Sequence, residues 1–252
     1  MKIVVAVKHV PDVQSERRLE DGILVRGEED VLNELDENAV EAAVSLAEEL
    51  DGEVVALTMG PLDAEDGLRR ALQMGADSGV LVTDDALAGA DVPTTARVLA
   101  AAIERIGEVD LVITGMSALD SMTSLLPGAL AASLRLPALT LANRLELADG
   151  EVTITRTLGT VTETLAAPLP ALVSVTDQAN EPRYPNFAAM RAAKKKPVEQ
   201  WDLSELGLSG LAPRVAVVDA QARPQREAGT IVTDAGQAGA QLAAWLVENQ
   251  LV

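Results

Sequence analysis

The chain has 252 residues, of which 48% are hydrophobic and 2% aromatic, and it carries a formal net charge of −19. This is enough for one sizeable domain or a domain with an extension, and no apolar run approaches the roughly 18 to 20 residues of a membrane span. The lack of cysteine excludes disulfides, thiolate zinc sites and iron–sulfur clusters held by this chain, and the acidic charge disfavours general binding to nucleic acid.

The first 115 residues alternate short apolar strands with amphipathic helices. The hydrophobic pattern predicts strands at 2–7, 53–58, 79–83 and 110–114, and helices at 33–50, 62–74 and 92–106. Elements that alternate in this way form a parallel sheet with helices on both faces. Ligands of such sheets bind beyond the carboxyl ends of the strands, so we expect a site in the loops after residues 7, 58 and 114.

The pattern changes after Pro137. Segments 139–147, 151–156 and 161–166 predict antiparallel strands joined by hairpins, and 171–176 returns as a buried strand. The tail is weakly patterned and ends in a short helix at 238–247, which contains Trp245.

We therefore expect a Rossmann-like, adenine nucleotide α-hydrolase-like α/β domain over 1–198, with a hairpin extension at 139–170. A C-terminal arm over 199–252 would pack on another chain, because it buries little against itself. The first residues are too few for a signal peptide and contain no cleavage site, so we expect a cytoplasmic protein.

The motifs of catalysis are mostly absent. The single histidine, His9, has no second histidine or cysteine with which to share a metal, and we interpret it as a loop residue near a strand end. No Walker A sequence, Gly-x-Gly-x-x-Gly or Gly-x-Ser-x-Gly occurs. We expect neither a metal site nor catalytic residues.

Two segments could hold a phosphate. Residues 115–128 follow a strand and lead into a helix predicted at 129–134, and residues 33–36 open the first helix. Small residues and hydroxyls at a helix N-terminus suit a phosphate, although plain capping by Asn33 or Asp36, or by the serines and threonine, is the alternative. Asp120 could accept a hydrogen bond from a sugar hydroxyl if its carboxylate points away from the phosphate.

Residues 180–196 gather features that the rest of the chain lacks. The only tyrosine, Tyr184, and the only phenylalanine, Phe187, lie here with five basic residues and no acidic residue after Glu181. An aromatic on a basic island in an acidic protein indicates a docking surface. The alternatives are that Phe187 belongs to the core and that the lysines at 194–196 are only a solvated face; otherwise these lysines steer acidic partners.

Several motifs together resemble the electron transfer flavoprotein β subunit, the small or FixA-like subunit. They cover essentially the whole chain, with the tail weakest. The motifs are Val7-Lys8, Val10-Pro-Asp12, Asn33-Glu-Leu-Asp-Glu-Asn-Ala-Val40, Gly60-Pro61, Ala71-Leu-Gln-Met-Gly-Ala-Asp77, Asp110-Leu-Val-Ile-Thr-Gly115, Arg156, Glu163-Thr164, Leu169-Pro170, Ser174-Val175, Asn180-Glu-Pro-Arg-Tyr-Pro185 and Ala192-Ala-Lys-Lys-Lys196.

The resemblance implies an electron carrier built as an αβ heterodimer. It would accept electrons from flavin dehydrogenases, such as acyl-CoA dehydrogenases, and pass them to a quinone oxidoreductase or another acceptor. The FAD would be held mainly by the α subunit, which fits the scarcity of aromatic residues in this chain.

The resemblance also implies a structural AMP. Its contacts fall on Ala6, Asn33, Glu34, Leu35, Asp36, Met59, Asp120, Ser121, Thr123, Ser124, Leu125, Pro127 and Gly128. Many family members have a glutamine where this chain has Leu125, and leucine donates no hydrogen bond, so one phosphate contact is lost unless Ser121 or Ser124 substitutes. A second FAD in the same space stays an alternative.

In the family, an apolar anchor after the Asn-Glu-Pro-Arg-Tyr motif inserts into the dehydrogenase, and Phe187 occupies that place here. Tyr184, Met190 and Arg191 would line the same contact. Two alternatives are a stand-alone adenine-nucleotide-binding module, which leaves Phe187 unexplained, and an ATP-pyrophosphatase type of enzyme. The second needs a Ser-Gly-Gly-type loop after the first strand, and residues 8–12 offer none.

Overall fold

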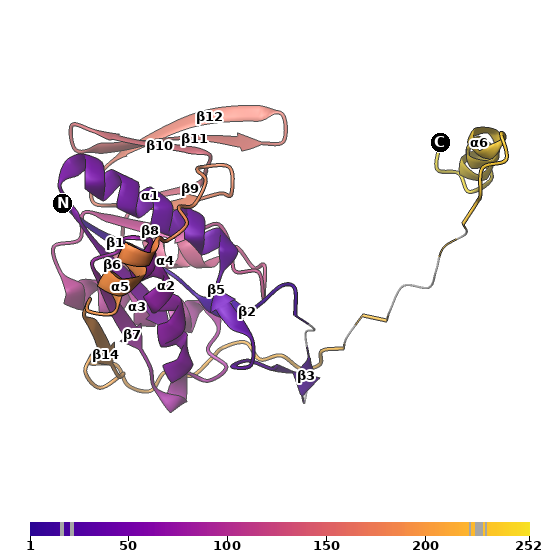
Figure 1. Ribbon diagram of the computed structural model, residues 1–252. Helices are drawn as coiled ribbons and strands as arrows, with labels where there is room; N and C mark the ends of the chain where they lie inside the picture. The colour runs from indigo at the N-terminus through magenta and orange to yellow at the C-terminus, as the bar shows by residue number, and fades with distance from the viewer. Residues whose placement is uncertain (16–17, 21–22, 222, 225–228, 230) are drawn as a thin grey trace. The chain divides into compact units, whose positions relative to one another are not determined.

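A parallel sheet of seven strands, in the order β14-β7-β6-β1-β8-β13-β9, lies at the centre of the fold (Figure 1). The computed structural model describes residues 1–15, 18–20, 23–221, 223–224, 229 and 231–252. The chain divides into two units, Met1–Ala220 and Gln221–Val252, and the sheet belongs to the first. Its strands are β1 (Lys2–Ala6), β6 (Glu53–Met59), β7 (Ser78–Val82), β8 (Leu111–Gly115), β9 (Ala138–Ala142), β13 (Ala171–Val175) and β14 (Val198–Trp201).

Helices cover both faces of this sheet, as the alternating pattern predicts. Alternate residues of β1 belong to different hydrophobic clusters: Ile3 and Val5 pack on the face of α1 (Glu34–Leu50) and α2 (Glu65–Met74). Val4 packs on the face of α3 (Val92–Ile106) and α4 (Leu126–Leu134). Because the strands are buried on both sides, they read as continuous apolar runs. The α/β fold class is confirmed.

Two helices differ in their limits from the prediction. The segment expected as one helix over 62–74 begins as a 3₁₀ turn, η1 (Leu62–Ala64), and continues as α2. A second 3₁₀ turn, η2 (Asp85–Leu87), precedes α3. Helix α4 starts three residues earlier than predicted, with Pro127 in its first turn, where a proline costs no hydrogen bond. Residues 126–128 are therefore helix rather than loop.

The prediction of a single antiparallel strand over 139–147 is wrong. The segment divides into β9, which pairs in parallel with β13, and β10 (Arg144–Ala148), which starts a separate antiparallel sheet with β11 (Glu151–Leu158) and β12 (Val161–Pro168). The division follows a bulge at Leu141, whose φ is 64° and whose N–H donates to the Ser174 hydroxyl at 2.9 Å. A leucine with a positive φ cannot be recognised from an apolar pattern. The predicted hairpins at β10–β11–β12 are confirmed.

Two small antiparallel sheets of two strands each follow the carboxyl end of β1 (Figure 1). Strand β2 (His9–Pro11) pairs with β5 (Asp30–Leu32), and β3 (Leu19–Glu20) pairs with β4 (Ile23–Leu24). The sequence does not predict them, because strands of two or three residues carry no periodicity.

The end of the first unit extends beyond the expected boundary at 198. Strand β14 joins the edge of the sheet, Trp201 and Leu203 are buried, and the unit ends at Ala220. The second unit contains α6 (Ala238–Glu248), which confirms the predicted C-terminal helix. Its apolar side chains Leu242, Trp245 and Val247 are exposed within the described structure.

Candidate functional site

The carboxyl ends of β1 and β8 meet the start of α1 in a tightly packed junction. The buried Asp36 carboxylate accepts a hydrogen bond from the Lys8 backbone N–H at 2.8 Å. Gly115 lies so close to α1 that a Cβ there would come within 2.4 Å of Asp36 Oδ1 and 2.7 Å of the Leu35 carbonyl oxygen. The glycine that ends the fourth predicted strand is therefore required by this close approach of two elements.

Burial raises the pKa of the Asp36 carboxyl to about 7, although hydrogen bonds from Asn33, Lys8 and Gly115 and the charge of Lys8 act in the opposite direction. Asp36 lies inside the first turn of α1 and is not its N-cap. Its carboxylate binds backbone of the β1 exit, so the plain-capping interpretation of Asp36 is wrong.

Asn33 occupies the N-cap position of α1, but its side chain makes no capping hydrogen bond. Instead, its Nδ2 donates to the Ser117 carbonyl at 2.9 Å, and its Oδ1 accepts from the Leu119 N–H at 3.0 Å. Asn33 thus holds the loop after β8 against α1. The amide and the carboxylate of the 33–36 cluster are both committed to protein groups, whereas Glu34 is exposed and Leu35 half-buried.

The Asp120 carboxylate forms ion pairs with two basic side chains. Its side chain is 1% exposed, and its oxygens accept from Lys8 Nζ at 2.8 and 3.0 Å and from the Arg26 guanidinium. Burial raises the pKa of this carboxyl, but the hydrogen bonds and charges of Arg26 and Lys8 outweigh that effect and hold it below the ordinary value. Neither cation was singled out from the sequence. The signal was present for Lys8, a lysine directly beyond a buried strand.

The side chains of Ala6 and Met59, which the sequence predicts at the site, lie on one face of the sheet together with that of Thr114, which it does not predict there. Ala6 pairs in register with Thr114, and Met59 ends the neighbouring strand β6. By the two-residue alternation of strands, all three face α3 and α4, as Val4, Leu57 and Val112 do. Residue Thr58, in contrast, faces α1 and α2 with Ala56.

Buried hydroxyls without partners mark this end of the sheet. The Oγ atoms of Thr58, Thr114 and Ser117 are buried, and none has a hydrogen-bond partner in the described structure. A buried unsatisfied polar group costs about 1–3 kcal/mol. The Thr114 and Ser117 hydroxyls thus lie unsatisfied at the strand ends.

The loop that leads into α4 is exposed and polar. Ser121, Thr123, Ser124 and Leu125 are exposed, and Ser124 has a φ of 51°. Leu125 is the N-cap residue of α4 and makes no side-chain cap, so the first-turn N–H groups of this helix are not used by a cap. Pro127 is buried and Gly128 is exposed.

The two aromatic side chains of the 180–196 segment are exposed. Tyr184 and Phe187 are each 88% exposed, which excludes the interpretation of Phe187 as core. Phe187 is the first residue of α5 (Phe187–Ala193), which Asn186 caps by accepting from the Ala189 N–H at 2.9 Å. Met190 is half-buried and Arg191 is exposed on the same helix.

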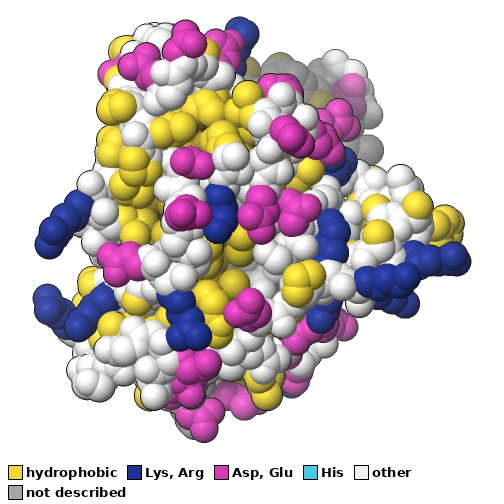
Figure 2. Space-filling view, turned by 90° about the vertical axis from the view of Figure 1, so that its left-hand side faces the viewer, with side chains coloured by type: hydrophobic (Ala, Val, Ile, Leu, Met, Phe, Trp, Pro, Cys, Tyr) yellow, Lys and Arg dark blue, Asp and Glu magenta, His cyan; other side chains and the backbone are white. Residues whose placement is uncertain are grey.

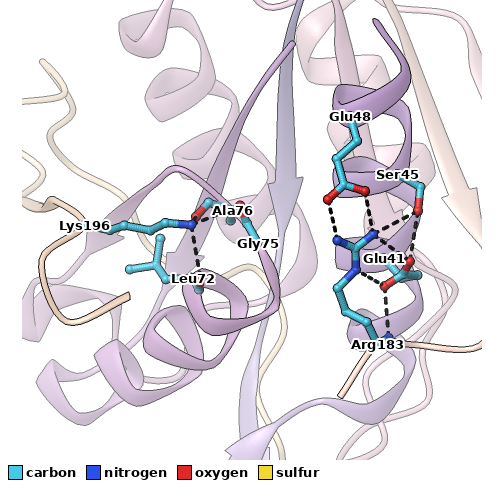
Figure 3. Close-up of polar contacts among 8 residues, drawn as sticks. All are labelled: Glu41, Ser45, Glu48, Leu72, Gly75, Ala76, Arg183 and Lys196. Atoms are coloured by element: carbon cyan, nitrogen blue, oxygen red, sulfur yellow. Dashed lines mark hydrogen bonds and ion pairs between the residues drawn. The ribbon is translucent and has the colours of Figure 1, made fainter. Parts of the chain in front are cut away.

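This segment is fixed to α1 at its start (Figure 3). The Arg183 guanidinium donates to both oxygens of Glu41, at 2.8 and 3.0 Å, and of Glu48, at 2.7 and 3.0 Å. These carboxylates raise the pKa of Arg183 above its ordinary value. Asn180 and Asn38 add a reciprocal pair of amide hydrogen bonds at 3.0 Å. The arginine of the predicted docking motif thus serves to position the segment.

The end of the segment is fixed to α2 (Figure 3). Lys196 Nζ donates to the carbonyls of Leu72, Gly75 and Ala76 at 3.3, 3.1 and 2.5 Å. A cation on the last carbonyls of a helix satisfies groups that otherwise lack partners. Burial lowers the pKa of Lys196, with the charge of Asp77 opposing. Only Lys194 and Lys195 of the basic run are exposed.

One cavity of the described structure lies at the opposite end of the sheet. It has a volume of about 290 Å³ and is lined by Met1, Leu50, Asp110, Leu147, Ala148, Asp149, Gly150 and Leu169, at the amino ends of the strands. Figure 2 looks onto the side on which the N-terminus lies, and hydrophobic side chains gather there in a hollowed band between charged ones. This cavity is remote from the strand ends that carry the predicted site. Within the described residues, no helix combines the length and apolar character that crossing a membrane requires.

Comparison with known proteins adds an independent line of evidence. The family model described as "Electron transfer flavoprotein domain" matches residues 21–206. The chain is 39% identical to the electron transfer flavoprotein subunit beta of Mycobacterium tuberculosis, over 99% of both chains. It is 36% identical to Protein FixA of Azorhizobium caulinodans, over 84% of this chain and 79% of that protein. It is also 35% identical to the caffeyl-CoA reductase-Etf complex subunit CarD of Acetobacterium woodii, over 83% and 81%.

Proposed function

Because this chain belongs to the electron transfer flavoprotein family and is a β-subunit homologue, an electron carrier subunit, we propose that it works as one half of an αβ heterodimer. The FAD of the pair is held mainly by the α subunit. Electrons come from flavin dehydrogenases, such as acyl-CoA dehydrogenases, and pass to a quinone oxidoreductase or another acceptor. The match over 99% of the chain supports this role, and so does its composition, since a chain with 2% aromatic residues offers little on which a flavin ring could stack.

The β subunit itself binds AMP at the carboxyl edge of the sheet. The observation that carries this proposal is the buried, unpartnered hydroxyl of Thr114, beside Ala6 and at the level where Met59 ends β6. A nucleotide there would satisfy a polar group that otherwise pays the cost of burial. The loop from Asp120 to Gly128 lies at the same edge and offers N–H groups at the start of α4 for the phosphate.

The charge of Asp120 fits a neighbouring phosphate because Lys8 and Arg26 already neutralise it. The Asp120 carboxylate therefore need not point away from the phosphate, because two positively charged side chains lie beside it. Asn33 and Asp36 contribute by fixing the junction, and Glu34 and Leu35 contribute through the backbone. Ser121, Thr123 or Ser124 supplies the hydrogen bond that Leu125 cannot donate.

The 180–196 segment docks the dehydrogenase. Phe187 is the anchor, with Tyr184, Met190 and Arg191 around it. Its exposure supports this role, because a single apolar side chain on a fixed base suits the small interfaces of transient electron-transfer encounters. The C-terminal unit, Gln221–Val252, packs on the α subunit, whereas residues 199–220 of the expected arm belong to the first unit. The exposed apolar side chains of α6 support this.

The test of the nucleotide site uses the purified αβ complex. After denaturation, the released adenine nucleotides are separated by chromatography; one AMP per β subunit is expected in addition to one FAD. Thr114→Val keeps the shape and removes the hydroxyl, and we expect AMP affinity to fall about 2- to 10-fold, the worth of one hydrogen bond.

Thr58→Val is the matched control, because its hydroxyl is also buried and unpartnered but faces α1 and α2. Its AMP affinity should stay within about twofold of that of the unaltered complex. Release of two FAD and no AMP would replace AMP with a second flavin. Equal loss in both threonine variants would contradict the placement of the site.

A further inference from the structure

The only histidine of the chain lies beside two carboxylates from residues distant in the sequence. His9 in β2, Asp30 in β5 and Asp63 in η1 each offer one ligand atom, and these three atoms lie within 4.8 Å of one another. The residues are 21 and 33 positions apart along the chain. A single histidine therefore does not mean a single ligand.

Fixed backbone carries all three residues. Strands β2 and β5 pair in antiparallel register, with His9 opposite Leu32 and Asp30 opposite Pro11. The His9 side chain packs against Gly67 of α2, where a Cβ would lie 3.7 Å from its Cδ2. The Asp63 carboxylate lies beside the Gly27 backbone, where a Cβ would come within 3.0 Å of Oδ2. Ligands on paired strands and a helical turn form a more precise site than ligands on a free loop.

A second observation points to a missing ligand. The Nε2 atom of His9 is buried and has no hydrogen-bond partner in the described structure. Two carboxylates held this close to each other also repel, unless a cation lies between them. Both costs disappear if the imidazole nitrogen and the two carboxylate oxygens bind a metal ion.

We propose that His9, Asp30 and Asp63 bind a divalent transition-metal cation of the Zn²⁺ class. One imidazole and two carboxylates are ligands that Zn²⁺ takes, and three protein ligands leave a fourth position for water. Tetrahedral bonds of about 2.1 Å put ligand atoms about 3.4 Å apart, so the side chains must close by roughly 1.4 Å at most. Asp63 is exposed and free to turn inward. The chain's net charge of −19 raises the local concentration of cations.

A metal ion at this site would connect the segments that follow β1 and β6 with strand β5. His9 follows β1 in the chain, Asp63 follows β6, and both strands end at the edge where the nucleotide is proposed to bind. The metal is independent of that nucleotide and of electron transfer. Its effect is to hold the β2–β5 strand pair against η1, which a measurement of stability detects.

The test uses the αβ complex, stripped of metal with a chelator and titrated with Zn²⁺ by calorimetry; Co²⁺ absorption reports the ligands. We expect one Zn²⁺ per β subunit. Asp63→Asn and His9→Gln should each lower the affinity about 100-fold or more. The matched control is Asp66→Asn, which removes one exposed carboxylate from the first turn of the next helix, outside the cluster. Its affinity should stay within about twofold.

Melting provides a second readout. Zn²⁺ should raise the melting temperature of the unaltered complex and of Asp66→Asn, and leave that of Asp63→Asn and His9→Gln unchanged. Melting without metal shows whether His9→Gln folds, and Asp63→Asn, at an exposed position, stands in if it does not. The proposal is overturned if no stoichiometric Zn²⁺ binds, or if both ligand variants bind it as well as the control does.

Discussion

Replacing Arg183 by methionine should destabilise the fold by about 2 kcal/mol, because Arg183 is the main partner of a mostly buried carboxylate. The side chain of Glu41 is 12% exposed, that of Arg183 32% and that of Glu48 61%. Breaking a fully buried ion pair from one side costs about 3–5 kcal/mol. Partial exposure of Arg183 and the remaining Ser45 hydrogen bond to Glu41 reduce this to about 1.5–2 kcal/mol, and the exposed Glu48 adds about 0.5 kcal/mol or less.

The assay is urea unfolding of the αβ complex and of its variants, with a double-mutant cycle. In a thermal unfolding experiment on a chain of this size, a loss of about 2 kcal/mol would lower the melting temperature by about 4–8 °C. Glu41→Gln should lose a similar amount, and the coupling energy between the two substitutions should be about 1–2 kcal/mol. Methionine keeps the apolar stem, so a loss of packing is excluded as the cause.

The pH dependence gives an independent test of the same contact. Burial raises the pKa of Glu41, but the hydrogen bonds from Arg183 outweigh this, and the pKa of Glu48 is lowered chiefly by its hydrogen bond to Arg183. A carboxyl with a lower pKa in the folded state stabilises the fold above its unfolded pKa, and this stabilisation disappears as the pH falls through the folded pKa. The difference between unaltered and Arg183→Met complexes should therefore shrink below about pH 4. A difference below about 0.5 kcal/mol at pH 7, or one that is the same at pH 3, would refute the reasoning.

Three further substitutions test other contacts. Phe187→Ala should leave unfolding and FAD content unchanged, since the ring is 88% exposed, but should slow electron transfer from a flavin dehydrogenase about tenfold in stopped-flow assays; loss of flavin would place Phe187 at the subunit interface instead. Lys196→Met should cost about 1–2 kcal/mol in urea unfolding, because three carbonyls at the end of α2 lose their donor, while Lys195→Met, at an exposed position, should cost little. Asp36→Asn should flatten stability between about pH 4 and 7: the pKa of Asp36 is raised to about 7, so the folded state holds an extra proton in that range and stability falls as the pH rises. An unchanged slope in this variant would show that Asp36 does not titrate in that range.

The regular elements were predictable because they depend on local periodicity. Strands β1, β6, β7 and β8 of the central sheet and helices α1 and α3 lie within two residues of their predicted limits. Their apolar residues recur at the spacing of a strand or a helix. The loops at the carboxyl edge followed from topology alone. The exposed Phe187 followed from composition, as an isolated aromatic in a basic stretch.

The remainder depends on partners distant in sequence. Asn33 resembles an N-cap in the sequence, but it bonds to a loop more than 80 residues away. Arg183 looks like part of a basic docking island until its partners on α1 are known, 142 and 135 residues earlier. No periodicity encodes such pairs. The bulge at Leu141 was missed for a different reason, since a hydrophobic pattern does not report a positive φ.

The path of the 180–196 segment constrains how this chain can vary. The segment leaves β13 on one side of the sheet, crosses α1 and α2, and enters β14 at the far edge. Five strand spacings of about 4.8 Å separate β13 from β14, so the crossing spans roughly 24 Å. Deleting residues between Arg183 and Lys196 would strain either the ion pairs of Arg183 with α1 or the pairing of the edge strand β14. Natural change in partner preference is therefore expected through side-chain replacement at 184–191 and outward insertions, with the length between the two anchors held or increased.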